Sequence, residues 1–177
     1  QTNGSFTDGA STVHSRSDYT YDSANRLTQI IRYDSDGTTP LHKSEFAYDG
    51  LNRKRINKEY SWNNGAWQLD SEVRRVYDGM NVVQERDGTN AVTAFYTRGA
   101  DMGGGIGGLL SRSTSAGNFY YHYDGRGNVT QLTDANQDAV AKYQYSAFGA
   151  LLSSVGPQAS ANPYRFSTKE IHAASGL

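Results

Sequence analysis

Four aspartates that follow a tyrosine in similar segments of this chain are the residues best suited to acid-base chemistry. They are Asp22, Asp49, Asp78 and Asp124. Two carboxylates can work as general acid and base, but such a pair is normally unique within a chain. These aspartates instead recur at equivalent places in similar segments, and aspartate side chains bind backbone amides in turns. We therefore interpret them as turn-building residues and expect no catalytic residue and no enzyme.

The residues that could bind a metal are scattered. The four histidines, His14, His42, His122 and His172, lie far apart in the sequence, and the 177 residues include no cysteine. A zinc site needs several such ligands to converge, usually from closely spaced pairs. We expect strand or surface histidines, no metal and no cofactor.

A glycine-rich segment, residues 103–108, formally fits the G-x-G-x-x-G pattern of nucleotide-binding loops. That pattern binds phosphate where a helix follows and points its amides at the anion. Residues 109–115 follow here, and they are poor in helix formers. We favour a flexible loop or a tight crossing between strands over a phosphate site.

The composition favours a sheet protein. The chain has 13 tyrosines but only 36% hydrophobic residues, and tyrosine suits strands because its ring is buried while its hydroxyl stays in water. The 17 basic and 18 acidic residues are interspersed, so nothing indicates a nucleic-acid partner. No apolar run approaches the ~20 residues that span a bilayer, so we expect no membrane span. The sequence starts at Gln1 without a signal-peptide pattern, and we expect a processed protein or an excised fragment.

The elements that must position the aspartates form a repeat. Segments starting near residues 19, 46, 75 and 121 align, with a degenerate copy at 143–151 and an eroded copy around Tyr96. The repeat-defining turn residues are Tyr21, Asp22, Tyr48, Asp49, Tyr77, Asp78, Tyr123, Asp124, Gly125 and Asn128. A period of about 20 to 30 residues is typical of repeat architectures.

The sequence of each repeat unit predicts two strands and two turns. Aromatic and apolar residues alternate before each Tyr-Asp pair, as in Tyr121-x-Tyr123, which is the period of a strand with one buried face. A second turn signal follows in each unit, such as Asp36-Gly37, and Asp-Gly is among the strongest hairpin signals. We predict an all-β chain of consecutive antiparallel hairpins with almost no helix.

The four Tyr-Asp turns resemble the YD repeats of RHS proteins, of the C components of bacterial toxin complexes and of teneurins. Residues 96–177 further resemble the RHS repeat-associated core through the segments 96–99, 123–129 and 163–170 and the glycine-rich loop at 103–108. We accordingly divide the chain into an N-terminal lead-in at 1–18, hairpin repeats at 19–95 and a core-like segment at 96–177.

The resemblance implies a sheet strip that coils into a spiral shell, which in bacteria often encloses a C-terminal toxin. The family's core usually continues into further strands and an aspartate-based self-cleavage segment, and no residue here matches that segment. The resemblance therefore identifies no autoproteolytic residue in this chain. A closed shell also takes many more than the five or six repeats present, so this length supplies an arc of wall.

We expect a structural protein, secreted or on the bacterial cell surface, that forms part of a shell and self-associates through open sheet edges. Its partners would be other copies, neighbouring repeats or an enclosed toxin domain. A second hypothesis is a carbohydrate-binding module, because flat rings suit sugar faces; the candidate stacking residues are Trp62, Trp67 and Tyr121. A third is a fragment of a self-cleaving toxin precursor.

Overall fold

The structure, a computed structural model, describes residues 6–7, 13–14 and 16–175. The strands are β1 (Phe6–Thr7), β2 (Val13–His14), β3 (Ser17–Tyr21), β4 (Leu27–Tyr33), β5 (Pro40–Tyr48), β6 (Lys54–Asn63), β7 (Ala66–Asp78), β8 (Asn81–Arg86), β9 (Val92–Arg98), β10 (Leu109–Thr114), β11 (Gly117–Tyr123), β12 (Val129–Thr133), β13 (Ala139–Tyr145) and β14 (Leu151–Val155). The helical element in the described part is a short 3-10 turn, η1 (Phe166–Thr168). The expected all-β class is confirmed.

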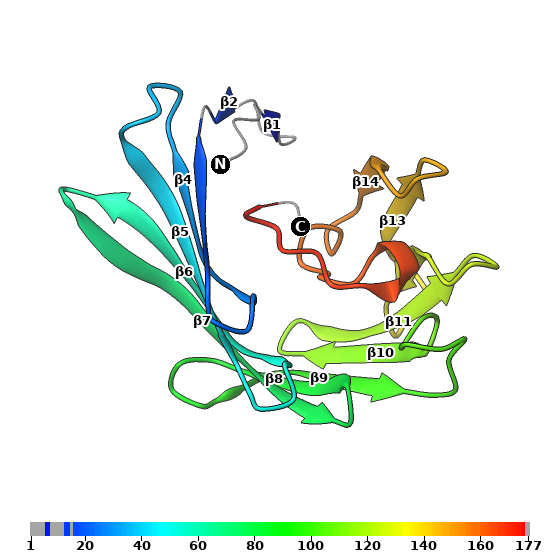
Figure 1. Cartoon of the computed structure of the whole chain (residues 1–177). Helices are drawn as coiled ribbons and strands as arrows, with labels where there is room; N and C mark the ends of the chain where they lie inside the picture. Colours follow the sequence, from blue (N-terminus) through cyan, green and yellow to red (C-terminus); the bar gives the residue numbers. More distant parts are fainter. Residues whose placement is uncertain (1–5, 8–12, 15, 176–177) are drawn as a thin grey trace. The chain divides into compact units, whose positions relative to one another are not determined.

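Strands β3 to β14 form one sheet of 12 strands in sequence order, and β1 pairs with β2 in a separate small sheet (Figure 1). Each strand of the large sheet therefore lies beside its neighbours along the chain. The pairings resolved in detail are antiparallel, and most shift register by a β-bulge. The fold is thus a run of consecutive antiparallel hairpins, as the sequence predicts. No helix in the described residues is long and apolar enough to cross a membrane.

The chain divides into two compact units, which are described separately. Unit 1 comprises residues 1–76 and 85–92, and unit 2 comprises residues 77–84 and 93–177. The three-part division drawn from the sequence stays a prediction, and much of its lead-in (residues 1–5, 8–12 and 15) lies outside the described residues.

In unit 1 the paired residues of β4 and β5 fix which side chains share a face. Ile30 lies opposite Ser44, and both are 2% exposed. Phe46 and Tyr48 follow Ser44 at alternate positions and so share that face. We call it the tyrosine face. The opposite face carries Lys43, which lies opposite Tyr60 of β6.

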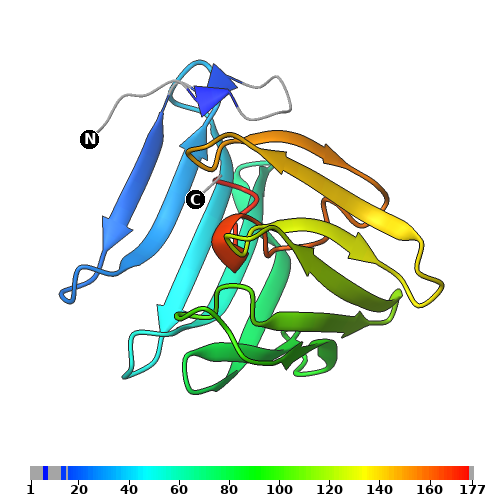
Figure 2. The ribbon, with the colours of Figure 1, turned by 90° about the vertical axis from the view of Figure 1, so that its right-hand side faces the viewer.

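In unit 2 the tyrosine face carries the main hydrophobic core. Tyr121 of β11 lies opposite Leu132 of β12, which in turn lies opposite Ala141 of β13. Leu132 is 1% exposed and Ala141 is fully buried. Residues 156–175 leave the sheet after β14, and the 3-10 turn lies against the strands of this unit (Figure 2).

Candidate functional site

The carboxylates of the Tyr-Asp turns bind the turn's own amides. Asp22 Oδ1 accepts hydrogen bonds from the amides of Ala24 and Arg26 at 2.9 and 3.0 Å, and Asp22 Oδ2 accepts one from Arg26 Nε at 2.7 Å. Asp49 repeats this arrangement with Leu51 and Arg53. The same contacts therefore close two successive loops.

Asp124 builds the same loop with a different fourth residue. Its Oδ1 accepts from the amides of Arg126 and Asn128, and its Oδ2 accepts from Asn128 Nδ2 at 2.7 Å. Asn128 therefore stands where arginines stand in the first two turns. Gly125 has an ordinary backbone conformation and open space around its α-carbon, so the loop does not require a glycine there.

The residue three places after each capping aspartate has a positive φ. The values are 58° at Asn25, 61° at Asn52 and 75° at Gly127. Its amide bonds the carbonyl of the capping residue, which gives a type I turn followed by a left-handed residue. The sequence pattern missed Gly127, because its Asn lies one place later than in the first two turns. Asp87, Asp134 and Ser146 build the same loop without a preceding Tyr-Asp pair.

The amide contacts hold the turn carboxylates ionised. Hydrogen bonding from the Arg26 amide lowers the pKa of Asp22. At Asp124 desolvation opposes ionisation, but the hydrogen bonds from Asn128 outweigh it and the pKa is lowered. These groups therefore act as permanent acceptors in the turns, which is the reverse of a carboxyl poised to give up a proton near neutral pH.

The Tyr77-Asp78 pair turns in a different way. β7 runs through Asp78, and a two-residue turn with Gly79 at φ 54° leads directly into β8. Asp78 therefore does not build the five-residue loop that Asp22, Asp49 and Asp124 build. The fourth residue after Asp78 is Val82, which is 7% exposed in the core and has no polar side chain to donate to a carboxylate.

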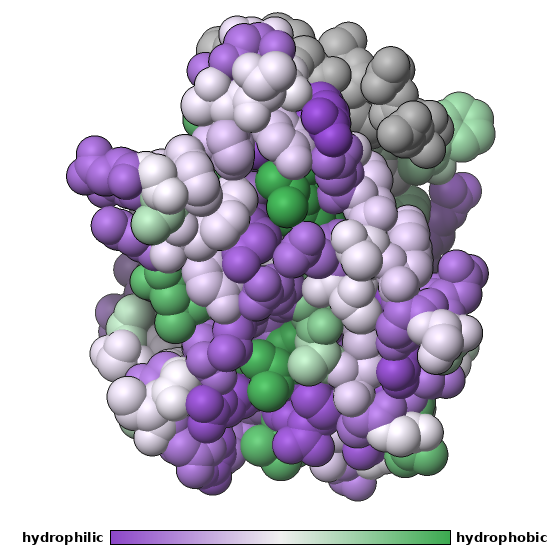
Figure 3. All heavy atoms as spheres, turned by 60° about the vertical axis from the view of Figure 1, so that its left-hand side comes forward, coloured by the Kyte–Doolittle hydropathy of each residue, from purple (hydrophilic) through white to green (hydrophobic). Residues whose placement is uncertain are grey.

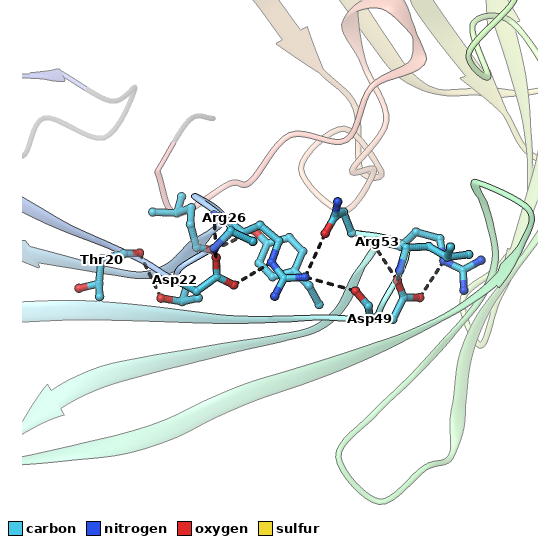
Figure 4. A network of polar contacts seen from close by, with 11 residues as sticks. Thr20, Asp22, Arg26, Asp49 and Arg53 are labelled. Atoms are coloured by element: carbon cyan, nitrogen blue, oxygen red, sulfur yellow. Dashed lines mark hydrogen bonds and ion pairs between the residues drawn. The ribbon is translucent and has the colours of Figure 1, made fainter.

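Arg26 links the first turn to the second (Figure 4). Its Nη1 donates to the Asp49 carbonyl at 3.3 Å and to Asn52 Oδ1 at 3.1 Å, and its guanidinium lies over the Tyr48 ring at 5.1 Å. Because Nε of the same side chain binds Asp22, one arginine fixes the spacing of two neighbouring hairpins.

The repeat tyrosines supply a second link between hairpins. Tyr48 donates its hydroxyl to the Leu27 carbonyl at 2.8 Å, and Tyr145 donates to the Val129 carbonyl at 2.9 Å. Each acceptor is the fifth residue after a capping aspartate, in the preceding hairpin. Tyr123 likewise donates to a carbonyl of the preceding hairpin, and burial raises its pKa to about 12. Tyrosine therefore ties each of these hairpins to the one before it.

A third set of contacts, which no sequence pattern indicated, holds the C-terminal segment on the tyrosine face of unit 2. Asn162 is 1% exposed; its Oδ1 accepts from the Tyr121 hydroxyl at 2.7 Å, and its Nδ2 donates to the Tyr164 carbonyl. Tyr143 donates to the Ala159 carbonyl at 2.9 Å. The segment thus covers the aromatic rows of β11 and β13.

The glycine-rich loop contributes to the same packing and is not arranged to bind phosphate. Two of its amides, at Gly103 and Gly105, donate to the Asp101 carboxylate, and the Gly107 amide donates to Thr168 Oγ1. A β-strand, β10, follows the loop where the nucleotide-binding pattern needs a helix. The loop joins the neighbouring antiparallel strands β9 and β10, so it is a hairpin connection and not a crossing between strands.

The three candidate stacking residues lie in different surroundings. Trp62 and Trp67 are opposite each other on β6 and β7, half-exposed, with ring centroids 4.9 Å apart in an edge-on arrangement. Tyr121 is 7% exposed and bonded to Asn162, so it cannot offer a ring face to a sugar. Burial by the C-terminal segment removes it from that set.

The histidines stay apart, and no group of three or more His, Cys, Asp or Glu side chains among the described residues could hold a metal ion. His42 contacts Glu59 at 2.6 Å, and Ser44 donates to the same carboxylate oxygen at 2.6 Å. Both partners use one oxygen of Glu59, so they do not form a Ser-His-acid relay. The cluster is a polar cross-strand contact on the tyrosine face of unit 1.

In the view of Figure 3 hydrophilic and intermediate residues predominate, and hydrophobic residues form separate small patches. The hairpin order, the capped turns and the links between hairpins together define a structural β-hairpin repeat protein.

Comparison with known protein families identifies a family to which part of this chain is similar. The RHS Repeat family matches residues 123–161. Residues 123–161 are therefore similar to an RHS repeat, and the resemblance to RHS and YD-repeat proteins inferred from the sequence is confirmed.

The similar curated proteins are bacterial. The chain is 29% identical over 160 residues to the tRNA3(Ser)-specific nuclease WapA of Bacillus spizizenii and 28% identical to the tRNA nuclease WapA of Bacillus subtilis strain 168. Each match covers 90% of this chain but only 6% of the relative. The nuclease names therefore refer to proteins of which this chain corresponds to a small part.

Solved structures of toxin complexes share the fold. The crystal structure of TcdB2-TccC3-Cdc42 matches 89% of this chain and 8% of its own chain with a TM-score of 0.63 at 13% identity. The Photorhabdus luminescens Tc holotoxin pore matches 87% of this chain and 8% of its own chain with a TM-score of 0.56 at 12% identity. At these identities the match concerns the fold.

Proposed function

We propose that this chain is a length of wall in a toxin-enclosing shell of a bacterial protein that is secreted or displayed on the cell surface. The observation that carries the proposal is the pair of links between hairpins, through Arg26 and through the tyrosine hydroxyls of Tyr48 and Tyr145. Such links fix the step from one hairpin to the next and can be repeated without limit, which suits a continuous wall.

The chemistry of the turns supports a structural role over a catalytic one. The aspartates that a hydrolase could use, such as Asp22, Asp49 and Asp124, are occupied by backbone amides. We propose that the activity named for the WapA relatives lies in a part of those proteins outside this region. The isolated chain should leave tRNA intact, and cleavage by the purified chain at a rate proportional to its concentration would contradict this.

The enclosure itself can be tested by limited proteolysis of the complete natural protein with mass mapping of the fragments. We expect a segment outside residues 16–175 that resists the protease until the wall is opened by mild denaturant. If every segment outside residues 16–175 is cut equally fast with and without denaturant, that result would contradict the enclosure. Intact mass after prolonged incubation of the isolated chain tests the self-cleavage alternative, for which we expect no change.

A second candidate function rests on one observation, the half-exposed pair of Trp62 and Trp67. Lys43 lies 5.4 Å from the Trp67 ring and binds Glu45, so polar groups stand beside the aromatic surface as in many sugar sites. A glycan array compares the wild type with Trp67→Ala, using Tyr120→Ala as a matched exposed control. Binding that only the Trp67 variant loses would support this function, and no glycan binding by the wild type would end it.

A further inference from the structure

The two end strands of the large sheet differ in what they expose. Among the strands that the structure describes, β3 and β14 are these end strands, and each has five residues. An end strand presents unpaired backbone groups to another strand unless charge, proline or a covering segment blocks it. β14 contains neither charge nor proline, and its Leu152 is 69% exposed. Among the described residues, this edge is therefore open to strand addition.

Inside the sheet, the tyrosine strands β5 and β13 join their preceding hairpins in the same register. Gln29 of β4 lies opposite Glu45 of β5, and Gln131 of β12 lies opposite Lys142 of β13. If the same pairing is continued from these residues to the turn, the repeat tyrosine lies beside the fourth residue after the capping aspartate of the preceding hairpin. This holds for both registers. The rule holds in unit 1 and in unit 2.

The same register brings the tyrosine hydroxyl to the carbonyl of the fifth residue after the cap. This is the contact seen from Tyr48 to Leu27 and from Tyr145 to Val129. The last capped turn of the sheet is that of Ser146, whose fifth residue is Leu151 at the start of β14. By the rule, the Leu151 carbonyl is the acceptor for one more tyrosine.

A pocket lies where that tyrosine would enter. It has a volume of about 520 Å³ and is lined mainly by apolar atoms, with Tyr145, Gly149, Ala150, Leu151 and Phe166 among its walls. A ring that is buried against such walls while its hydroxyl reaches a carbonyl has the chemistry of tyrosine. The pocket and the acceptor therefore select the same side chain.

A matching tyrosine stands at the other end of the sheet. Tyr21 is the repeat tyrosine of β3, and it is 53% exposed. Its counterparts Tyr48, Tyr123 and Tyr145 all donate to a carbonyl of a preceding hairpin, whereas in the described part of the chain Tyr21 has no such acceptor. Tyr21 is thus the donor of the repeat contact and Leu151 is its acceptor position.

We propose that β14 of one copy receives β3 of a second copy, with Tyr21 in the pocket and its hydroxyl on the Leu151 carbonyl. The repeat register then sets Tyr21 beside Ala150 and Asp18 beside Ser153. The two surfaces differ, so the contact is heterologous and copies associate head to tail. This inference rests on the proposed wall function, because both use the sheet's capacity to grow by one strand at a time.

Sedimentation velocity over a concentration series tests the contact with two complementary variants. Tyr21→Ala removes the entering side chain and keeps β14. The double change Leu151→Asp with Ser153→Asp keeps β3 but puts acids into the pocket wall and opposite Asp18. Each variant alone should raise the dissociation constant at least tenfold, whereas an equimolar mixture should form a one-to-one dimer.

Tyr120→Ala is the matched control, since Tyr120 is 44% exposed on β11, an inner strand, and should associate like the wild type. Circular dichroism of each variant verifies the fold. Association of the Tyr21 variant at wild-type strength, or a mixture that stays monomeric, would overturn the head-to-tail contact. A wild type that is monomeric at every concentration would also overturn it but leave the wall function standing, which proteolysis of the complete protein tests separately.

Discussion

Removing one hydroxyl, by Tyr145→Phe, should lower the free energy of unfolding of unit 2 by about 1–2 kcal/mol. The Tyr145 hydroxyl donates to the carbonyl of Val129, a residue that is fully buried. A buried acceptor that loses its donor costs about 1–3 kcal/mol. Phenylalanine keeps the ring and therefore the edge-on contact with Phe166 at 5.6 Å. The change isolates the link between hairpins.

Differential scanning calorimetry measures this effect. For a chain of this length each kcal/mol shifts the Tm by roughly 2–4 °C, so the variant should melt about 2–8 °C lower. The control is Tyr120→Phe, which removes an exposed hydroxyl and should change stability by less than about 0.5 kcal/mol. Equal Tm values for the Tyr145 and Tyr120 variants would refute the reasoning that tyrosine hydroxyls tie one hairpin to the next.

Three further predictions concern the turns. Asp49→Ala should lower the Tm, whereas Asp78→Ala, in a nearly identical sequence without the five-residue loop, should leave it unchanged in the same calorimetric scan. The hydrogen bonds from Thr39 lower the pKa of Asp36 from the usual 3.8 to about 2. The urea midpoint of unfolding should therefore fall as the pH drops through this window. The sign follows because these carboxylates bind fewer protons in the folded chain than in the unfolded chain; midpoints that stay constant over that window would contradict it. Gly156→Ala should cost more than about 2 kcal/mol, since φ is 113° and a Cβ would lie 2.4 Å from the Val140 carbonyl oxygen, while Gly125→Ala should stay within about 0.5 kcal/mol by urea denaturation.

The hairpin order could be predicted from the sequence because its signals are local. An alternating strand followed by Tyr-Asp, or by Asp-Gly, carries both the period and the turn chemistry within a few residues. Asp49 and Asp78 show where local signals stop being sufficient. Their surrounding sequences nearly match, yet Val82 occupies the place of Arg53 and is buried in the core, so packing decides the turn.

The packing of the C-terminal segment on the tyrosine face of unit 2 could not be predicted, because its contacts join residues far apart in the sequence. Asn162 meets Tyr121 across 41 positions, and Thr168 meets the Gly127 carbonyl across the same separation. Neither residue lies in a periodic pattern. The expectation that Tyr121 is available for sugar stacking failed for this reason. The register of the strands could likewise not be predicted from the sequence. The proposed contact of β3 with β14 depends on that register.

The most direct test of the central claim is an electron cryomicroscopy map of the complete natural protein. The wall function predicts a hollow particle in which residues 16–175 form a continuous part of the wall. A particle without an enclosed volume, or one in which residues 16–175 lie outside the wall, would contradict the account.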